Sequence, residues 1–249
     1  MSKFFKVFLT IIFFIFSLHY TNKIIEYFQK KDPLMQEIIK RQNNYYQAPI
    51  DAIITNNVII PEVNGIKINV KKSYQKMKKL NIFNESLLVY DNILPKISYL
   101  NHYDKIIIPR NNHNLSIVFD IDNNITLFNS INKILKENNV VGNLLNSTLD
   151  IKDTNFKNIL STNYSNIIDY CISFTLDINN ECKINKKYTV FTKENIINNY
   201  YLNNTKKAIN NHNNIIIYHF DNNSINNLEI LIKYLKTNYF NLTSIDNLI

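Results

Sequence analysis

Two carboxylates, Asp120 and Asp122, lie one residue apart at the end of the apolar run in IVFDIDNN, residues 117–124. A third ionisable side chain, His219, ends a similar run in NIIIYHF, residues 214–220. Paired carboxylates can bind a metal ion or act as a general base, and a histidine can act as a general acid. A strand that merely runs into a polar turn would leave the same pattern. These three side chains form the candidate site.

The elements that must position this site follow residue 115, where apolar runs alternate with stretches of helical periodicity. Strands are predicted in 115–121, 140–145, 167–174, 189–191, 214–220 and 241–249, and helices in 126–139, 155–163, 178–188, 204–213 and 225–240. This alternation predicts parallel strands with right-handed crossovers, in an α/β sheet or barrel. Functional groups in such folds lie at the carboxyl ends of strands, where Asp120 and His219 are placed.

The chain begins with a basic and then apolar segment. Lys3 and Lys6 precede the run from Val7 to Leu18, which has signal-sequence length and is short for a membrane span. No small-residue cleavage pattern follows, so we predict an uncleaved signal anchor in residues 1–20. A cleaved signal peptide and a buried core helix are the alternatives. The lysines before the run favour a single-pass cell-membrane protein with residues 21–249 outside the cytoplasm.

Three further segments are expected after the anchor. Residues 21–47 predict a juxtamembrane helical stalk that is interrupted at Pro33. Residues 48–110 predict a small α+β extension module, with a hairpin in 51–61, a positive φ at Gly65 and a helix in 70–83 capped by Ser73. Residues 111–249 form the α/β domain.

The net charge of +8 could indicate a nucleic acid or another anionic partner. The lysines are scattered, however, and the one dense cluster, residues 71–79, fits the solvated face of a helix. No zinc-finger spacing and no interleaving of aromatic with basic residues accompanies it. We therefore predict no nucleic-acid partner.

The two cysteines, Cys171 and Cys182, show no metal-binding spacing. Two unpaired buried thiols are the expected state, and a disulfide is the alternative that an extracytoplasmic location permits. A thiol–imidazole pair of Cys171 and His219 is a weaker possibility.

The quoted motifs resemble those of the polysaccharide deacetylases, the NodB homology or carbohydrate esterase family 4 proteins. SIVFDIDNN, residues 116–124, resembles their first motif, Thr-Phe-Asp-Asp-Gly, and residues 214–249 resemble the end of that domain. Residues 45–90 look like the extension of a divergent, membrane-anchored Firmicute branch. The resemblance covers most of residues 31–249 and implies a (β/α) barrel that deacetylates cell-wall or chitin-like polysaccharide.

The resemblance also implies roles for single residues. The family holds a divalent metal such as zinc with one Asp and two His, uses a preceding Asp as base, and uses a late His as acid. Asp120 matches the base position and His219 the acid position. Ile121 falls on the metal-ligand Asp, and Asp122 comes one residue late. Because residues 143–170 contain no histidine, no metal site and no cofactor are evident.

The length agrees with a reduced domain, because only about 134 residues follow Leu115, fewer than a full barrel uses. We therefore expect a deformed, incomplete (β/α) barrel, preceded by the extension and a membrane helix. The function expected is that of a catalytically impaired pseudoenzyme that binds or scaffolds cell-wall polysaccharide. One alternative is an active metal-dependent N-deacetylase using Asp120, Asp122 and His219. Another is a membrane-tethered interaction module that acts through residues 48–110.

Overall fold

The computed structural model describes residues 3–110, 113–162, 169–178, 180–193, 196–198, 201–210, 214–221 and 224–249. The chain divides into two compact units. Unit 1 comprises Met1–Ile50 and Val63–Pro95, and unit 2 comprises Asp51–Glu62 and Lys96–Ile249. Residues 51–62 and 96–110, which the sequence placed in the extension module, therefore belong to the unit that holds the α/β sheet.

Unit 1 is built from one long helix, several short helices and one antiparallel pair of strands. Its elements are α1 (Lys3–Lys31), α2 (Pro33–Arg41), the 3₁₀ helix η1 (Gln42–Tyr45), β3 (Gly65–Ile68), α3 (Val70–Met77), η2 (Glu85–Leu87) and β4 (Tyr90–Ile93). The break at Pro33 is confirmed, because proline opens α2 and Asp32 caps it by accepting the amide hydrogen of Leu34. Strands β3 and β4 pair antiparallel.

The core of unit 1 lies between α2 and α3. Leu34, Met35 and Ile38 of α2 pack against Tyr74 and Met77 of α3, and all five are buried. The lysines of α3 face solvent, as the sequence predicted. The expected cap was wrong: Asn69 caps α3 by accepting from the Lys72 amide, while Ser73 is buried and its hydroxyl accepts from the Val89 amide.

Gly65 is needed for a reason other than the one expected, because its φ is not positive. A Cβ at this position would lie 2.5 Å from the Gln47 carbonyl oxygen and 2.5 Å from the Pro49 nitrogen. Both are backbone atoms of the segment that bridges β3 at Gln47 and Ile66. Gly65 therefore permits a close approach of two backbone segments.

Asp32 gives unit 1 a pH-dependent contribution to its stability. Hydrogen bonds from Lys78 and then Tyr74 lower the pKa of Asp32 from 3.8 to about 2. A lowered carboxyl pKa stabilises the fold above the unfolded pKa, so this contribution should disappear as the pH falls from about 4 to about 2. We expect Asp32→Asn to lower the thermal midpoint at pH 6 and to match the wild type near pH 2. An equal difference at both pH values would contradict this origin.

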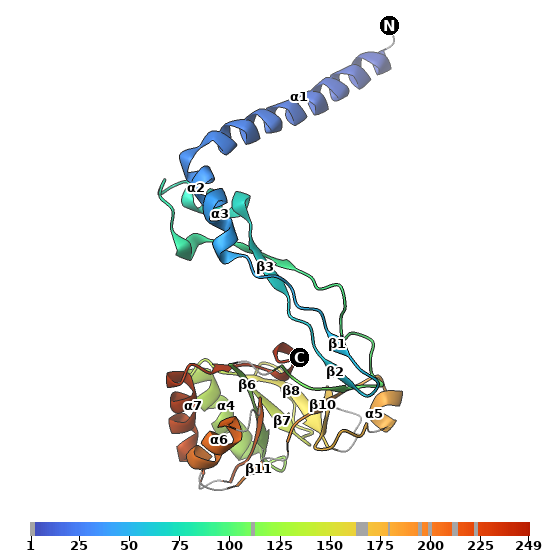
Figure 1. The fold of residues 1–249 in the computed structure, drawn as a ribbon, viewed down its shortest axis with the longest axis vertical. Helices are drawn as coiled ribbons and strands as arrows, with labels where there is room; N and C mark the ends of the chain where they lie inside the picture. The colour runs from blue at the N-terminus through green and yellow to red at the C-terminus, as the bar shows by residue number, and fades with distance from the viewer. Residues whose placement is uncertain are drawn as a thin grey trace. The chain divides into compact units, whose positions relative to one another are not determined.

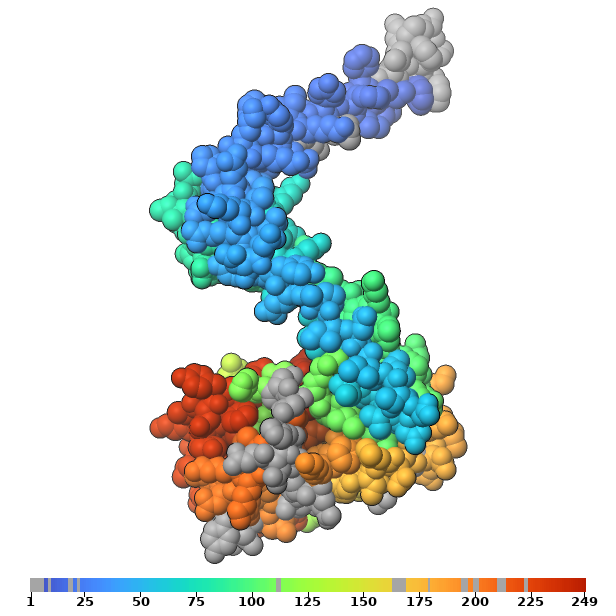
Figure 2. Space-filling model, in the orientation of Figure 1, coloured from blue at the N-terminus to red at the C-terminus, as the bar shows by residue number. Residues whose placement is uncertain are grey.

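Helix α1 differs from the rest of unit 1 because its apolar side chains are not packed. Phe13, Phe14 and Phe16 are 72%, 65% and 66% exposed, and the space-filling view shows the side chains of α1 standing out along the blue segment (Figure 2). Within the described residues, no helix combines the length and the apolar character that crossing a bilayer requires.

Unit 2 is a mainly parallel sheet with helices on one face (Figure 1). Its strands, in sheet order, are β1 (Ile53–Ile54), β2 (Val58–Ile60), β5 (Ile106–Ile107), β10 (Tyr188–Phe191), β9 (Tyr170–Ser173), β8 (Phe156–Ser161), β7 (Gly142–Leu145), β6 (Asn114–Asp120), β12 (Ile215–His219) and β11 (Ile196–Ile197). Strand β13 (Asn241–Leu242) pairs with the start of β6. The β1–β2 hairpin is confirmed and is antiparallel, whereas every other pairing along this path is parallel.

The helices of unit 2 are α4 (Ile125–Glu137), α5 (Asn180–Ile184), α6 (Tyr201–Asn210) and α7 (Leu228–Thr237), with 3₁₀ turns η3 (Ile225–Asn227) and η4 (Ile245–Asn247). They agree with four of the five predicted helices. The remaining prediction, a helix in 155–163, was wrong, because residues 156–161 form β8 between β7 and β9. Burial of Ile159 and Leu160 within the sheet outweighs the local helical pattern.

Alternate residues of the strands enter two apolar clusters. The helix-side cluster joins Ile117, Phe119 and Tyr218 to α4, α6 and α7. The strand-side cluster takes residues from eight strands, together with Ala52 and with Ile245 and Leu248 near the end of the chain. Its strand members are Ile59, Ile107, Val118, Leu145, Leu160, Ile172, Val190, Ile215 and Ile217. Burial on both faces explains the continuous apolar runs of β6 and β12, residues 117–119 and 215–218.

The sheet curls back toward itself, although strand pairing does not close it in the described part of the chain. Strands β10 and β12 are five spacings apart in the sheet, about 24 Å if the sheet were flat. Yet the Thr192 hydroxyl, just after β10, donates to the Ile215 carbonyl of β12 over 3.3 Å. The α/β class is thus confirmed with barrel-like curvature, whereas a closed barrel is not observed.

Candidate functional site

Asp120 and His219 meet at the carboxyl ends of two neighbouring strands. They are register partners of β6 and β12, and His219 Nδ1 lies 3.3 Å from Asp120 Oδ2. The Asp120 side chain is 23% exposed and that of His219 is 40% exposed. When Nδ1 carries the proton it donates to the carboxylate, and Nε2 is then the basic nitrogen. The prediction that these two residues lie at the carboxyl ends of strands is therefore confirmed.

Strand alternation places both side chains on the face of the strand-side cluster. Val118 and Ile217 precede Asp120 and His219 by two residues each and belong to that cluster. Directly below the pair, Val118 and Ile217 form an apolar layer. The pair therefore lies against apolar side chains at the strand edge, a position that can hold a polar ligand.

Ile121 points away from this pair. It is 1% exposed and belongs to the helix-side cluster with Leu127 and Phe128 of α4. The position that the resemblance assigns to a metal-ligand Asp thus holds an apolar side chain, packed between the sheet and its covering helices.

Asp122 occupies a turn rather than the edge that carries Asp120 and His219. The Asn124 amide donates to the Ile121 carbonyl over 2.9 Å, and the two residues between them, Asp122 and Asn123, have φ of 48° and 57°. Positive φ at both central positions is the signature of a type I′ turn, which favours Asn, Asp and Gly. Asp122 is exposed and makes no hydrogen bond or ion pair within the described residues. The conformation of the turn therefore accounts for an aspartate at this position.

The donor set at this edge does not fit a three-ligand metal site. Among the residues that the structure describes, no three His, Cys, Asp or Glu side chains are grouped so that they could hold a metal ion. Of the other histidines, His113 packs its ring 6.3 Å from that of Phe240, and His212 lies outside the described residues.

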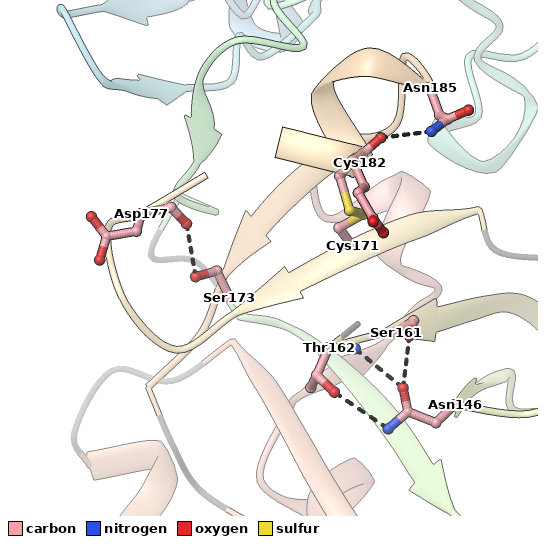
Figure 3. The surroundings of a disulfide bond; sticks show 9 residues. Asn146, Ser161, Thr162, Cys171, Ser173, Asp177, Cys182 and Asn185 are labelled. Carbon is pink, nitrogen blue, oxygen red and sulfur yellow. Dashed lines mark hydrogen bonds between the residues drawn. A yellow bond between two sulfur atoms is a disulfide. The ribbon is translucent and has the colours of Figure 1, made fainter. Parts of the chain in front are cut away.

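Polar side chains at the neighbouring strand ends mainly bind one another. Asn146, after β7, accepts hydrogen bonds from the Ser161 hydroxyl and the Thr162 amide at the end of β8 (Figure 3). The Ser173 hydroxyl, at the end of β9, donates to the Asp177 carbonyl. These contacts order the described residues that follow β7, β8 and β9.

Cys171 and Cys182 form a disulfide, so the expected pair of free thiols was wrong. The bond joins β9 to α5 with a Cα–Cα distance of 6.4 Å, and both cysteines are 1% exposed (Figure 3). It also rules out a thiol–imidazole pair of Cys171 and His219.

We expect loss of this disulfide to lower the free energy of unfolding by about 3 kcal/mol, from the loop entropy that an eleven-residue separation implies. Urea unfolding of the wild type with and without dithiothreitol measures the effect. The Cys171→Ala/Cys182→Ala variant should show no dependence on reductant. Two reactive thiols in the oxidised native protein would contradict the pairing.

A buried polar network beneath the site was not predicted. Asn143 of β7 is fully buried; its amide donates to the Ser116 hydroxyl and the Ile117 carbonyl over 2.8 and 3.0 Å. Its oxygen accepts from Asn158 of β8 over 3.1 Å. Asn158 also donates to Asp246 over 2.7 Å, so the network ties three strands to η4. The only signal in the sequence is an asparagine inside the apolar run VVGNLL.

Comparisons with known proteins place this fold. No protein-family model matches the chain. The uncharacterized protein YlxY of Bacillus subtilis (strain 168) is 38% identical over 68 residues, which are 27% of this chain. The match spans about a fifth of that curated relative, 21% of its length.

Solved structures match over far more of the chain. BA3943, a CE4 family pseudoenzyme from Bacillus anthracis, has a TM-score of 0.66 and 16% identity, covering 86% of this chain and 94% of that one. A BA3943 mutant with restored enzymatic activity also has a TM-score of 0.66, and this match covers 97% of the mutant's chain. At this identity the likeness concerns the fold. This chain has the fold of a divergent polysaccharide deacetylase-like protein, in agreement with the resemblance of its motifs.

Proposed function

We propose that this protein is a catalytically impaired deacetylase-like protein that binds N-acetylated cell-wall polysaccharide at the carboxyl ends of β6 and β12. The observation that carries the proposal is the contrast between neighbouring residues. Asp120 and His219, to which the resemblance assigns the base and acid positions, contact each other over 3.3 Å, whereas Ile121, at the position of a metal ligand in the resemblance, is buried. A structural neighbour of the same fold is itself described as a pseudoenzyme.

The retained pair can bind a glycan without performing hydrolysis. A carboxylate accepts hydrogen bonds from hydroxyl and amide groups, and an imidazole can donate or accept them. Both side chains are partly exposed at the strand edge where α/β folds bind ligands. The described residues offer no group of three metal ligands of the kind with which the family activates a water molecule.

We also propose that unit 2 lies outside the cytoplasm and that the N-terminal helix anchors the chain to the cell membrane. The Cys171–Cys182 disulfide supports the first part, because such bonds form and persist in oxidising compartments. The exposed apolar side chains of α1 support the second, since their exposure in water is unfavourable.

Titration calorimetry with chitooligosaccharide and soluble peptidoglycan fragments tests the proposed binding. We expect Asp120→Asn to weaken binding about tenfold or more, because it removes a charge-assisted hydrogen bond. Asp122→Asn is the matched control: it has the same chemistry two residues away, in a turn that accepts asparagine, and should bind as the wild type does. Equal affinities of all three proteins, or no binding by the wild type, would contradict the proposal.

The active N-deacetylase remains the competing function. It would need Asp120, Asp122 and His219 to act around a metal, and Asp122 lies in the turn instead of beside the pair. Release of acetate that is abolished by Asp120→Asn would favour this alternative.

A further inference from the structure

The net positive charge of this chain comes from unit 1. Its residues include thirteen Lys and Arg against five Asp and Glu, a net charge of +8. Unit 2 contains fifteen basic and fifteen acidic residues and is neutral overall. The charge that looked scattered along the sequence is thus separated between the two compact units, and unit 1 alone should attract an anionic surface.

Helix α3 presents part of this charge on one exposed face. Lys72 and Lys76 lie four residues apart on the helix, and Lys79 follows three residues later in the turn that ends it. All three are exposed, while Tyr74 and Met77 on the other side are buried against α2. Helices α2 and α3 lie side by side (Figure 1). Their packing fixes which side of α3 carries the exposed lysines.

Contacts of α3 connect the lysine face to the C-terminal end of α1. Lys71 Nζ lies 3.4 Å from Glu26 Oε1 of α1, and Lys78 and Tyr74 bind Asp32, the residue that caps α2 directly after α1. Glu26 is eight residues beyond the end of the apolar run at Leu18, about 12 Å along a helix. The axial separation of about 12 Å between Leu18 and Glu26 is close to the electrostatic screening length of about 8 to 10 Å at moderate salt.

We propose that unit 1 docks on the surface of an anionic lipid bilayer, with the apolar residues of α1 in the bilayer and Lys72, Lys76 and Lys79 on its headgroups. The inference rests on the proposed membrane attachment through α1 and adds a lipid preference to it. The twelve residues from Val7 to Leu18 extend about 18 Å, less than the hydrocarbon thickness of about 30 Å, which leaves the following basic residues near the headgroups.

A bilayer accounts for the features of unit 1 better than a nucleic acid does. Both are polyanions and both would attract the lysines. Only a bilayer also covers the exposed apolar side chains of α1, such as Phe13, Phe14 and Ile15, which have no counterpart in a phosphodiester backbone.

Vesicle co-sedimentation of the full chain tests the two parts separately. The wild type with neutral phosphatidylcholine vesicles tests the apolar attachment. Phe13→Gln/Phe14→Gln/Ile15→Gln weakens that attachment at exposed positions, so that binding to vesicles with one third phosphatidylglycerol then reports the charge. In this background we expect the preference for anionic vesicles to fall about a hundredfold when Lys72→Gln/Lys76→Gln/Lys79→Gln is added. It should also fall at high salt.

The matched control is Lys152→Gln/Lys183→Gln/Lys207→Gln, three exposed lysines of unit 2, which should leave the preference unchanged. Equal effects of the two triple variants, or equal binding to neutral and anionic vesicles, would overturn the lysine assignment. If Lys72→Gln/Lys76→Gln/Lys79→Gln lost affinity for a DNA duplex but kept its affinity for anionic vesicles, the lipid assignment of these lysines would be overturned in favour of nucleic acid. Failure of the wild type to bind neutral vesicles would sink only the apolar attachment.

Discussion

Ile121→Asp is expected to destabilise unit 2 by about 5 kcal/mol and not to create a metal site. Ile121 is 1% exposed and packs with Leu127 and Phe128 between the sheet and α4. The substitution removes a buried aliphatic side chain and places a carboxyl group among apolar atoms without a partner. Both changes cost free energy, and neither aims an oxygen at Asp120 or His219.

Urea unfolding of Ile121→Asp and of Ile121→Val, with and without zinc, measures this effect. The valine variant keeps an apolar side chain and should lose only about 1 kcal/mol. An Ile121→Asp protein of unchanged stability that binds zinc tightly would show that this position can face the site.

Asn143→Ala is expected to have the next largest effect, a loss of about 4 kcal/mol in the free energy of unfolding. Asn143 of β7 is fully buried. Its side chain hydrogen-bonds Ser116 and Ile117 of β6 and Asn158 of β8. Alanine would leave their polar groups without this partner in a site that water does not reach. Burial, followed by the Asp246 carboxylate, also raises the pKa of Tyr170 next to this network.

A double-mutant cycle with Asn158→Ala tests whether the two asparagines act together. We expect a coupling free energy above about 0.5 kcal/mol, because their amides share a hydrogen bond of 3.1 Å. Asn185→Ala, an exposed asparagine that bonds only the Glu181 carbonyl in the described chain, is the control and should change stability by less than about 0.5 kcal/mol. Additive effects of the two buried substitutions would contradict a network.

The strands around the site could be predicted because their burial on both faces leaves a direct mark on the sequence. The runs that end at Asp120 and His219 are continuously apolar, and their parallel pairing follows from the helices between them. Strand β8 lacked such a mark because it contains Lys157 and Asn158. Asn158 is satisfied by Asp246, 88 residues away, a partner that no local pattern reveals.

Two features of the candidate site depended on geometry that spacing does not encode. The role of Asp122 follows from φ values at a turn, and the sequence shows only that the chain could turn there. The pairing of Cys171 with Cys182 depends on where α5 packs against β9. The positions of Asp120 and Ile121, by contrast, followed from strand alternation, which sends adjacent side chains to opposite faces.

Acetate release tests the central claim, a retained base and acid without a working metal site. The oxidised full chain would be incubated with N-acetylated chitooligosaccharide and peptidoglycan, with zinc, cobalt or manganese added in turn, and acetate measured against a buffer blank. We expect release no faster than the blank with every metal, even where calorimetry shows that the glycan binds. Metal-dependent release that Asp120→Asn abolishes would contradict it.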